Sequence, residues 1–177
     1  GPLGEMRGQV EPLKKAWDAI CTWVHAYDSF QVSPLAEVDA EGAERQATDL
    51  QSTLMKVSKQ IEKKGSSSGS NDKPAASKAA DKVVDVIKRF MKECIPLMHL
   101  ICTQGIKDRH WKDIKASTGL DFESGPSTTL KQVYDIGLHL QVPAIEDTCV
   151  SAAKENGLEK AMDKMEGMWQ SLKCQCI

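Results

Sequence analysis

The sequence lacks the long apolar runs of a membrane protein. Its 177 residues contain no stretch of about 18 apolar residues, and the N-terminus has no apolar core of a secretory signal. It also lacks an excess of positive charge, since 23 basic side chains face 25 acidic ones. That balance argues against nucleic acid as the main partner. We therefore predict no membrane partner and no nucleic acid partner.

Proline, glycine and period-two patterns are also scarce. Only seven prolines and twelve glycines occur, and no segment alternates convincingly between apolar and polar residues. Alanine, lysine, glutamate, methionine and leucine favour helices over strands. We predict an all-α fold, an elongated helical bundle of about five to seven helices with short connecting helices.

The motifs of common enzymes are missing as well. No Gly-x-x-x-x-Gly-Lys-Ser/Thr loop is present to hold nucleotide phosphates, and no Gly-x-Gly-x-x-Gly, Gly-x-Ser-x-Gly or His-Glu-x-x-His occurs. Because each chemistry depends on that local geometry, we predict no catalytic residue and no cofactor in this chain.

The six cysteines stand at positions 21, 94, 102, 149, 174 and 176, with no Cys-x-x-Cys pair. A disulfide framework is not expected, and Cys21, Cys94 and Cys149 are interpreted as small apolar residues on helix faces. The ending Cys174-Gln175-Cys176-Ile177 formally fits a prenylation motif, but Gln175 is a poor aliphatic residue. A chain boundary explains that ending better.

The best metal candidates are two cysteines and two histidines: Cys94, His99, Cys102 and His110. A zinc site needs four convergent ligands, and Pro96 interrupts the spacing. We therefore favour core thiols and a partly exposed imidazole, and predict no metal site.

A Ser/Gly-rich stretch, residues 65–74, divides the chain. It is predicted to be a flexible linker, either native or engineered. Residues 5–64 before it predict a helical hairpin, and residues 75–177 after it predict a helical subdomain. Residues 1–4, Gly-Pro-Leu-Gly, are typical of an expression-tag remnant, which indicates a piece of a longer protein.

Apolar residues at helical spacing define two helices in the first half. The first should begin near Glu11-Pro12 and end before Ser33-Pro34. Its expected core stripe is Leu13, Trp17, Ile20, Val24 and Tyr27, with Trp23 off the stripe. The second helix should begin after Asp39. Its seam of Ala43, Ala47, Leu50, Leu54, Val57 and Ile61 suits an antiparallel partner.

The second half predicts further helices. A long one should run from Ala75, kink at Pro96 and end with Gly105 as its C-cap. Its stripe is Ala76, Ala80, Val83, Ile87, Phe90 and Cys94. Two short helices should follow, one over residues 107–117 ending at Gly119 and one from Thr128 or Thr129 to Gly137.

The last region, from Pro143 to about Leu172, carries two apolar sets. The first is Ile145, Cys149 and Ala152, and the second is Leu158, Met162, Met165, Trp169 and Leu172. Asn156-Gly157 puts the two sets out of phase, so we expect a bend or a new helix there. Met162, Met165 and Met168 are typical either of a promiscuous binding groove or of a core, and core is the expected role.

The densest cluster of chemical groups is Asp108-Arg109-His110-Trp111. A catalytic histidine beside a carboxylate is one interpretation, but no nucleophile accompanies it. We favour a structural anchor, in which Trp111 fills the core, Asp108 suits a first helical turn and Arg109 pairs with a carboxylate elsewhere.

Residues 105–114, Gly-Ile-Lys-Asp-Arg-His-Trp-Lys-Asp-Ile, resemble the Arg-His-Trp segment of dynein heavy chains, in the linker region that precedes the motor ring. Residues 129–138 resemble that family's next short helix, and segments from Ile145 to Trp169 resemble its long helical tail in the same order. The match is specific over residues 95–170 and weaker over 11–61. Gln104-Gly105 replaces the family's usual Asn-Pro pair.

The resemblance implies a piece of a helical arm that arches over a ring of ATPase modules and bends as nucleotide is bound and released. The implied partners are the rest of the heavy chain with its ring, and microtubules only through the parent protein, where ATP and Mg would bind. The style of the sequence resembles axonemal heavy chains, which implies the cytoplasm and its cytoskeleton, in the axoneme of a cilium or flagellum.

Five residues are the expected structural anchors: Asp108, Arg109, His110, Trp111 and Trp169. Four glycines are candidate hinges, although ordinary C-caps remain the plain alternative: Gly105, Gly119, Gly137 and Gly157. Two other functions stay open, a helical adaptor that binds a partner helix and, more remotely, an enzyme using His110 with Asp108. For a lever segment we expect a monomer that neither hydrolyses ATP nor binds microtubules directly.

Overall fold

The structure, a computed structural model, describes residues 2–35, 37–65, 73–102, 105–123, 125 and 127–175; for residues 2–9, 65 and 173–175 it describes the backbone alone. The predicted linker and the Cys174–Ile177 motif therefore lie largely outside the described residues and side chains. In the described part of the chain, six α-helices and one 3-10 helix follow in order: α1 (Pro2–Val32), α2 (Ala40–Gly65), α3 (Ala75–Ile101), α4 (Asp108–Thr118), α5 (Leu130–Asp135), η2 (Leu138–Gln141) and α6 (Val142–Gln175). The all-α prediction is confirmed.

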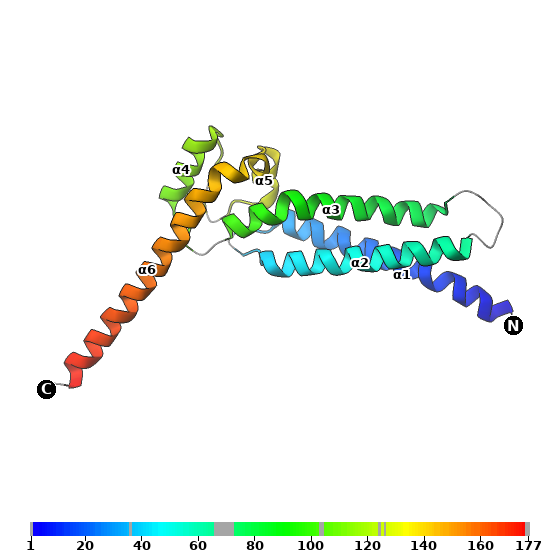
Figure 1. Ribbon diagram of the computed structural model, residues 1–177, viewed down its shortest axis with the longest axis horizontal. Helices are drawn as coiled ribbons and strands as arrows, with labels where there is room; N and C mark the ends of the chain where they lie inside the picture. Colours follow the sequence, from blue (N-terminus) through cyan, green and yellow to red (C-terminus); the bar gives the residue numbers. More distant parts are fainter. Residues whose placement is uncertain are drawn as a thin grey trace.

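Helices α1, α2 and α3 lie side by side as an elongated bundle, and α4 and α5 lie at one end of it (Figure 1). Helix α6 starts at that end and runs away from the bundle (Figure 1). The only contact of β type in the described part of the chain is one antiparallel bridge between Pro34 and Thr129. No helix among the described residues is both long and apolar enough to cross a bilayer.

Helix α1 differs from the prediction in its start and in its buried face. It begins at Pro2 instead of Glu11, and Pro12 lies inside it. The residues before Pro12 include Leu, Glu, Met, Arg and Gln, which are good helix formers, so one lost backbone donor does not end the helix.

The expected α1 stripe is wrong at Leu13, Trp17 and Val24, which are exposed. The buried face consists of Ala16, Ala19 and Trp23, with Ile20, Tyr27 and Phe30 partly buried. Small alanines allow α1 to approach α2 closely, where Ala43 and Ala47 are also buried. Trp23 packs edge-on against Phe90 with ring centroids 5.3 Å apart. Cys21, expected on a packed face, is exposed.

Helices α2 and α3 follow the predicted seams. The α2 seam is buried at Ala43, Ala47, Leu54, Val57 and Ile61, with Leu50 partly buried. The α3 seam is buried at Ala80, Ile87, Phe90 and Cys94, with Val83 partly buried. Pro96 lies inside α3, which ends at Ile101 with Cys102 as its C-cap. The predicted cap at Gly105 is therefore wrong.

The two short helices lie where they are predicted, but α4 lies one residue later at each end and α5 ends at Asp135, with Ile136 instead of Gly137 as its C-cap. Helix α4 ends at Thr118, and its C-cap Gly119 has a left-handed backbone with φ of 67°. The Thr129 hydroxyl accepts a hydrogen bond from the backbone N–H of Gln132, and the Gln132 side chain accepts one from the N–H of Thr129. This reciprocal cap starts α5.

Helix α6 is continuous, so the predicted break at Asn156-Gly157 is wrong. A glycine inside a helix costs about 1 kcal/mol, which is too little to end a helix with good formers on both sides. Ile145, Cys149 and Ala152 are buried as predicted. The second apolar set is exposed instead of buried, because the far half of α6 lies beyond the bundle (Figure 1).

Candidate functional site

The Arg-His-Trp segment lies where α4 crosses α6. We call this site the α4–α6 junction and define it as residues 105–111 together with residues 152–159. Helix α4 begins there at Asp108, with Lys107 as its N-cap residue. The backbone N–H of Lys107 donates to His110 Nδ1 at 3.0 Å, so the His110 ring closes the first turn of α4.

Because His110 Nδ1 accepts a hydrogen bond, the ring proton is assigned to Nε2. That nitrogen donates to Glu155 Oε2 of α6 at 3.2 Å. His110 is buried, while Asp108 is exposed in the first turn of α4 and makes no bond to the ring among the described contacts. The arrangement is that of a positioned structural histidine.

Two cations of the same segment contact carboxylates of α6. Lys107 Nζ lies 2.5 and 2.7 Å from the two carboxylate oxygens of Glu159, and Arg109 Nη2 pairs with Glu155. The guanidinium of Arg109, together with His110, holds the pKa of Glu155 below its usual range against a smaller effect of burial. Glu155 is half-exposed, so these pairs orient the two helices more than they add stability.

Apolar packing lies beneath the ion pairs. Trp111 and Ile114 are buried, and the Trp111 ring meets Phe122 edge-on with centroids 5.9 Å apart. Lys115 Nζ lies 5.1 Å from the centre of the Phe122 ring. Helix α4 thus packs through its buried apolar face, and its charged first turn makes separate contacts with α6.

Gly105 brings the chain against α6 without a side chain. Its φ is 109°, in the left-handed region that favours glycine. A Cβ atom at this position would lie 2.4 Å from Cβ of Asn156 and 3.1 Å from the carbonyl oxygen of Ala152. Gly105 is therefore a packed crossing point, with no room for even a methyl group.

The other three candidate hinges have open surroundings. A Cβ at Gly119 or Gly157 would meet nothing within 4 Å, and one at Gly137 would only touch Leu140 at 3.9 Å. Gly119 and Gly137 have positive φ at helix ends, as C-cap glycines do, whereas Gly157 lies inside α6.

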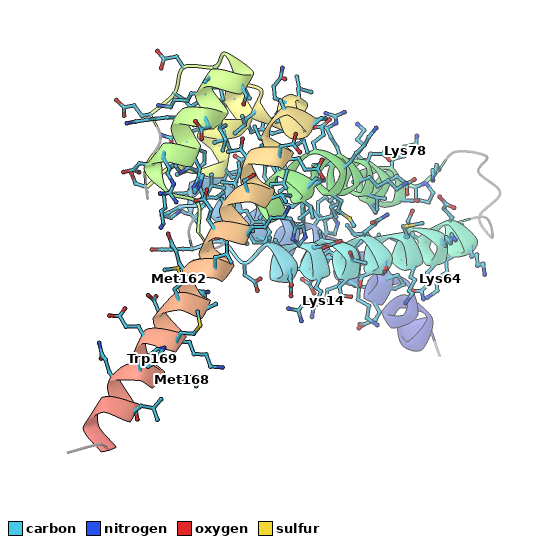
Figure 2. All side chains as sticks on the ribbon, turned by 60° about the vertical axis from the view of Figure 1, so that its left-hand side comes forward. Lys14, Lys64, Lys78, Met162, Met168 and Trp169 are labelled. Atoms are coloured by element: carbon cyan, nitrogen blue, oxygen red, sulfur yellow. The ribbon has the colours of Figure 1, made fainter. Side chains whose placement is uncertain are left out.

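Beyond the junction, α6 carries an exposed apolar face. We call it the distal stripe: Leu158, Met162, Met165, Trp169 and Leu172. Figure 2 shows Met162, Met168 and Trp169 on the far half of α6, away from the other helices. Trp169, an expected anchor, is 68% exposed, and no described residue covers it. The prediction that this face and the three methionines Met162, Met165 and Met168 belong to the core is wrong, because all are exposed and no described residue covers them.

The four metal candidates are engaged in other contacts. His99 Nε2 lies 3.0 Å from Glu44, and the Cys102 thiol donates to the carbonyl of Leu35 at 3.0 Å. Burial raises the pKa of Cys94 to about 12 and that of Cys102 to about 11. Among the described residues, no group of three or more His, Cys, Asp or Glu side chains is placed to hold a metal ion.

Two partners of the junction escaped the sequence analysis, namely Glu155 and Glu159. Their spacing of four residues places both carboxylates on one face of α6, which is the only signal the sequence offers. The contact between Gly105 and Asn156 joins residues that are 51 positions apart, and no local sequence pattern predicts it.

Comparison with known proteins matches nearly the whole chain to one family. Residues 3–177 match the sequence model of the family described as "Dynein heavy chain, N-terminal region 2". Mouse dynein axonemal heavy chain 1 is 26% identical over 170 residues, which cover 96% of this chain and 4% of the relative. Mouse dynein axonemal heavy chain 3 is 28% identical over 156 residues, covering 85% and 4%.

A third relative, rat dynein axonemal heavy chain 5, is 24% identical over 172 residues, covering 96% of this chain and 4% of its own length. The chain thus spans about 4% of the length of the curated relatives it matches. No solved structure matches it significantly.

Proposed function

The chain belongs to the dynein heavy chain family, and from that premise we propose that it is a non-catalytic mechanical element, a segment of the linker or lever arm. In this role it couples the nucleotide cycle of an adjoining ATPase ring to movement along microtubules. The parent protein is a microtubule motor ATPase that binds ATP and Mg, and this segment contributes no catalytic group. The axonemal relatives support a place in the axoneme of a cilium or flagellum.

The observation that supports the proposal best is the α4–α6 junction. A lever must transmit force without local melting, and here one uninterrupted helix of 34 residues is fixed near its middle. Gly105 packs against its backbone, Lys107 contacts Glu159, and Arg109 and His110 both contact Glu155. Torque applied to the far half of α6 therefore reaches the bundle through a defined set of contacts.

The distal stripe supports the assignment of the partner. Five apolar side chains at heptad spacing indicate a face that packs on another helical element. We assign this element to the rest of the heavy chain, which reaches microtubules only through its other parts.

The test removes the charged contacts of the junction in the whole heavy chain. The double variant Lys107→Ala/Arg109→Ala should keep the ATPase rate, because no catalytic group is touched, but should slow microtubule gliding. The matched control is Lys112→Ala/Lys131→Ala, which removes two exposed lysines of α4 and α5. Unchanged gliding, or a parallel loss of ATPase and gliding, contradicts the proposal.

The distal stripe also favours a second candidate, a helical adaptor that captures a partner helix. Sedimentation of the 177-residue chain separates the two. A lever segment should sediment as a monomer, whereas an adaptor seam without its partner should self-associate in proportion to concentration.

A further inference from the structure

The charges of the three-helix bundle are separated along its length. Residues 56–82 carry seven lysines and three acidic residues, whereas the rest of the chain carries 16 basic and 22 acidic residues. At the other end of α2, residues 37–49 carry five acidic residues and a single arginine. The bundle therefore has one basic end and one acidic end.

The basic end is the end where α2 finishes and α3 begins. We call it the basic tip and define it by six lysines, all exposed: Lys56, Lys59, Lys63, Lys64, Lys78 and Lys82. Figure 2 shows Lys64 and Lys78 at the end of the bundle that lies away from α4 and α6. Two helices that are adjacent in space thus bring their lysines to the same end of the bundle.

The described acidic residues of the tip are already used inside it. Lys73 Nζ pairs with Asp81 of α3 and lies 2.6 Å from Glu62 of α2. Two buried serines complete the cluster: Ser58 donates to Asp81 at 2.8 Å, and Ser77 donates to Glu62 at 3.0 Å. Since these carboxylates pair with Lys73, they do little to offset the positive field of the five exposed lysines Lys56, Lys59, Lys63, Lys78 and Lys82.

Helix stability alone does not account for these lysines. Lys63 and Lys64 suit the last turn of α2, where the helix dipole favours cations. Lys78 lies near the start of α3, where the dipole disfavours a cation, and the first turn of α3 holds no acidic residue. The tip thus carries more positive charge than its helices require.

We propose that the basic tip is a docking surface for a flexible, acidic polypeptide segment of a partner protein. The lysines point to different sides. Lys56, Lys59 and Lys63 share the α2 face opposite the buried seam, and Lys78 and Lys82 share the corresponding face of α3. A flexible chain can wrap around such a tip, whereas a rigid helix contacts only one side of it.

The charge separation also selects a polypeptide over an extended polyanion. At 1.5 Å per residue, the acidic residues of α2 from Glu41 to Asp49 lie about 10 to 35 Å along the helix axis from its tip lysines, which is about one to three Debye lengths at about 0.1 M salt. A short acidic segment confined to the tip meets mainly positive charge. A DNA duplex or a membrane surface that lies along the bundle faces the acidic end as well.

Fluorescence anisotropy of the 177-residue chain with a labelled 20-residue polyglutamate peptide tests the proposal. Binding should weaken more than tenfold when NaCl rises from 50 to 300 mM. It should also weaken at least tenfold in the tip variant, in which four lysines become glutamine: Lys59→Gln, Lys63→Gln, Lys78→Gln and Lys82→Gln.

The matched control changes the net charge equally, at four exposed lysines outside the tip: Lys112→Gln, Lys131→Gln, Lys154→Gln and Lys164→Gln. It should change the affinity less than twofold, with circular dichroism melts showing that both variants fold. An equal loss in the two variants overturns the proposal, because overall charge then explains the binding. Tighter binding of a 20-base-pair DNA duplex or of phosphatidylserine vesicles at the same salt overturns it as well.

Discussion

Replacement of Gly105 by alanine should destabilise the chain far more than the same replacement at Gly119. Both glycines have positive φ, 109° and 67°, which costs an alanine about 1–2 kcal/mol. At Gly119 the new methyl group meets nothing within 4 Å. At Gly105 it would lie 2.4 Å from Cβ of Asn156, against an ordinary carbon contact of about 3.5–4 Å.

The overlap forces α6 to shift by about 1 Å or the loop before α4 to rearrange, and overpacking of this kind costs about 1–3 kcal/mol. We therefore expect Gly119→Ala to lose about 1–2 kcal/mol and Gly105→Ala about 2–5 kcal/mol of unfolding free energy. Urea titration followed by circular dichroism at 222 nm measures both. A Gly105→Ala loss no larger than that of Gly119→Ala would refute the close crossing.

A double-mutant cycle tests the identity of the contact. Asn156→Gly removes the Cβ that the new methyl group meets, at a helix-propensity cost of about 0.3 kcal/mol, because asparagine is itself a poor helix former. Combined with Gly105→Ala, it should recover part of the loss, so the two changes should not be additive. Strictly additive losses of unfolding free energy would mean that the methyl group at residue 105 does not contact Asn156 of α6.

Three further predictions concern side chains. Trp111→Ala should lower the unfolding free energy by about 3–5 kcal/mol, because the ring is buried against Phe122. Trp169→Ala should lower it by less than about 0.5 kcal/mol in this chain, because the ring is exposed. Thermal melts of the two variants compare these losses. Lys73 chiefly lowers the pKa values of Glu62 and Asp81 from their ordinary values of 4.5 and 3.8. Their contribution to stability is therefore fully present above those ordinary values and is lost as pH falls through the lowered folded values. Urea titrations at pH 7 and pH 3 should therefore show a smaller acid-induced loss in Lys73→Ala than in the unsubstituted chain, and an equal loss would contradict the pairing.

The sequence predicts helices well where only one face is apolar. On α2, the seam from Ala43 to Ile61 has no competing stripe, and it is buried as expected. On α1, a stripe of large residues such as Trp17 and a stripe of small residues such as Ala16 are both candidates for the buried face. Periodicity favours the larger residues, but close helix packing selects the alanines.

The distal half of α6 shows a different limit. Heptad spacing from Leu158 to Leu172 indicates that this helix face is suited to burial, but it does not identify the element that packs on the face. Gly157 was expected to interrupt the helix, yet its propensity cost is small beside the cooperativity of helix propagation.

The junction itself could be predicted only in part. The burial of Trp111 and Ile114 follows from local spacing, and a carboxylate partner for Arg109 was expected without a position. The choice of Glu155 depends on the fold, because 46 residues separate the two side chains along the chain. A single sequence contains no record of such a pairing.

Because α6 is unbroken, a small rotation at the junction produces a large displacement of its C-terminal end. About 20 residues extend beyond Glu155, which at 1.5 Å per residue gives an arm of about 30 Å. A tilt of about 10° at the fixed point would carry the free end sideways by about 5 Å, close to the pitch of one helical turn. A sub-ångström adjustment at a glycine can thereby become a step of one full turn against whatever helix lies alongside.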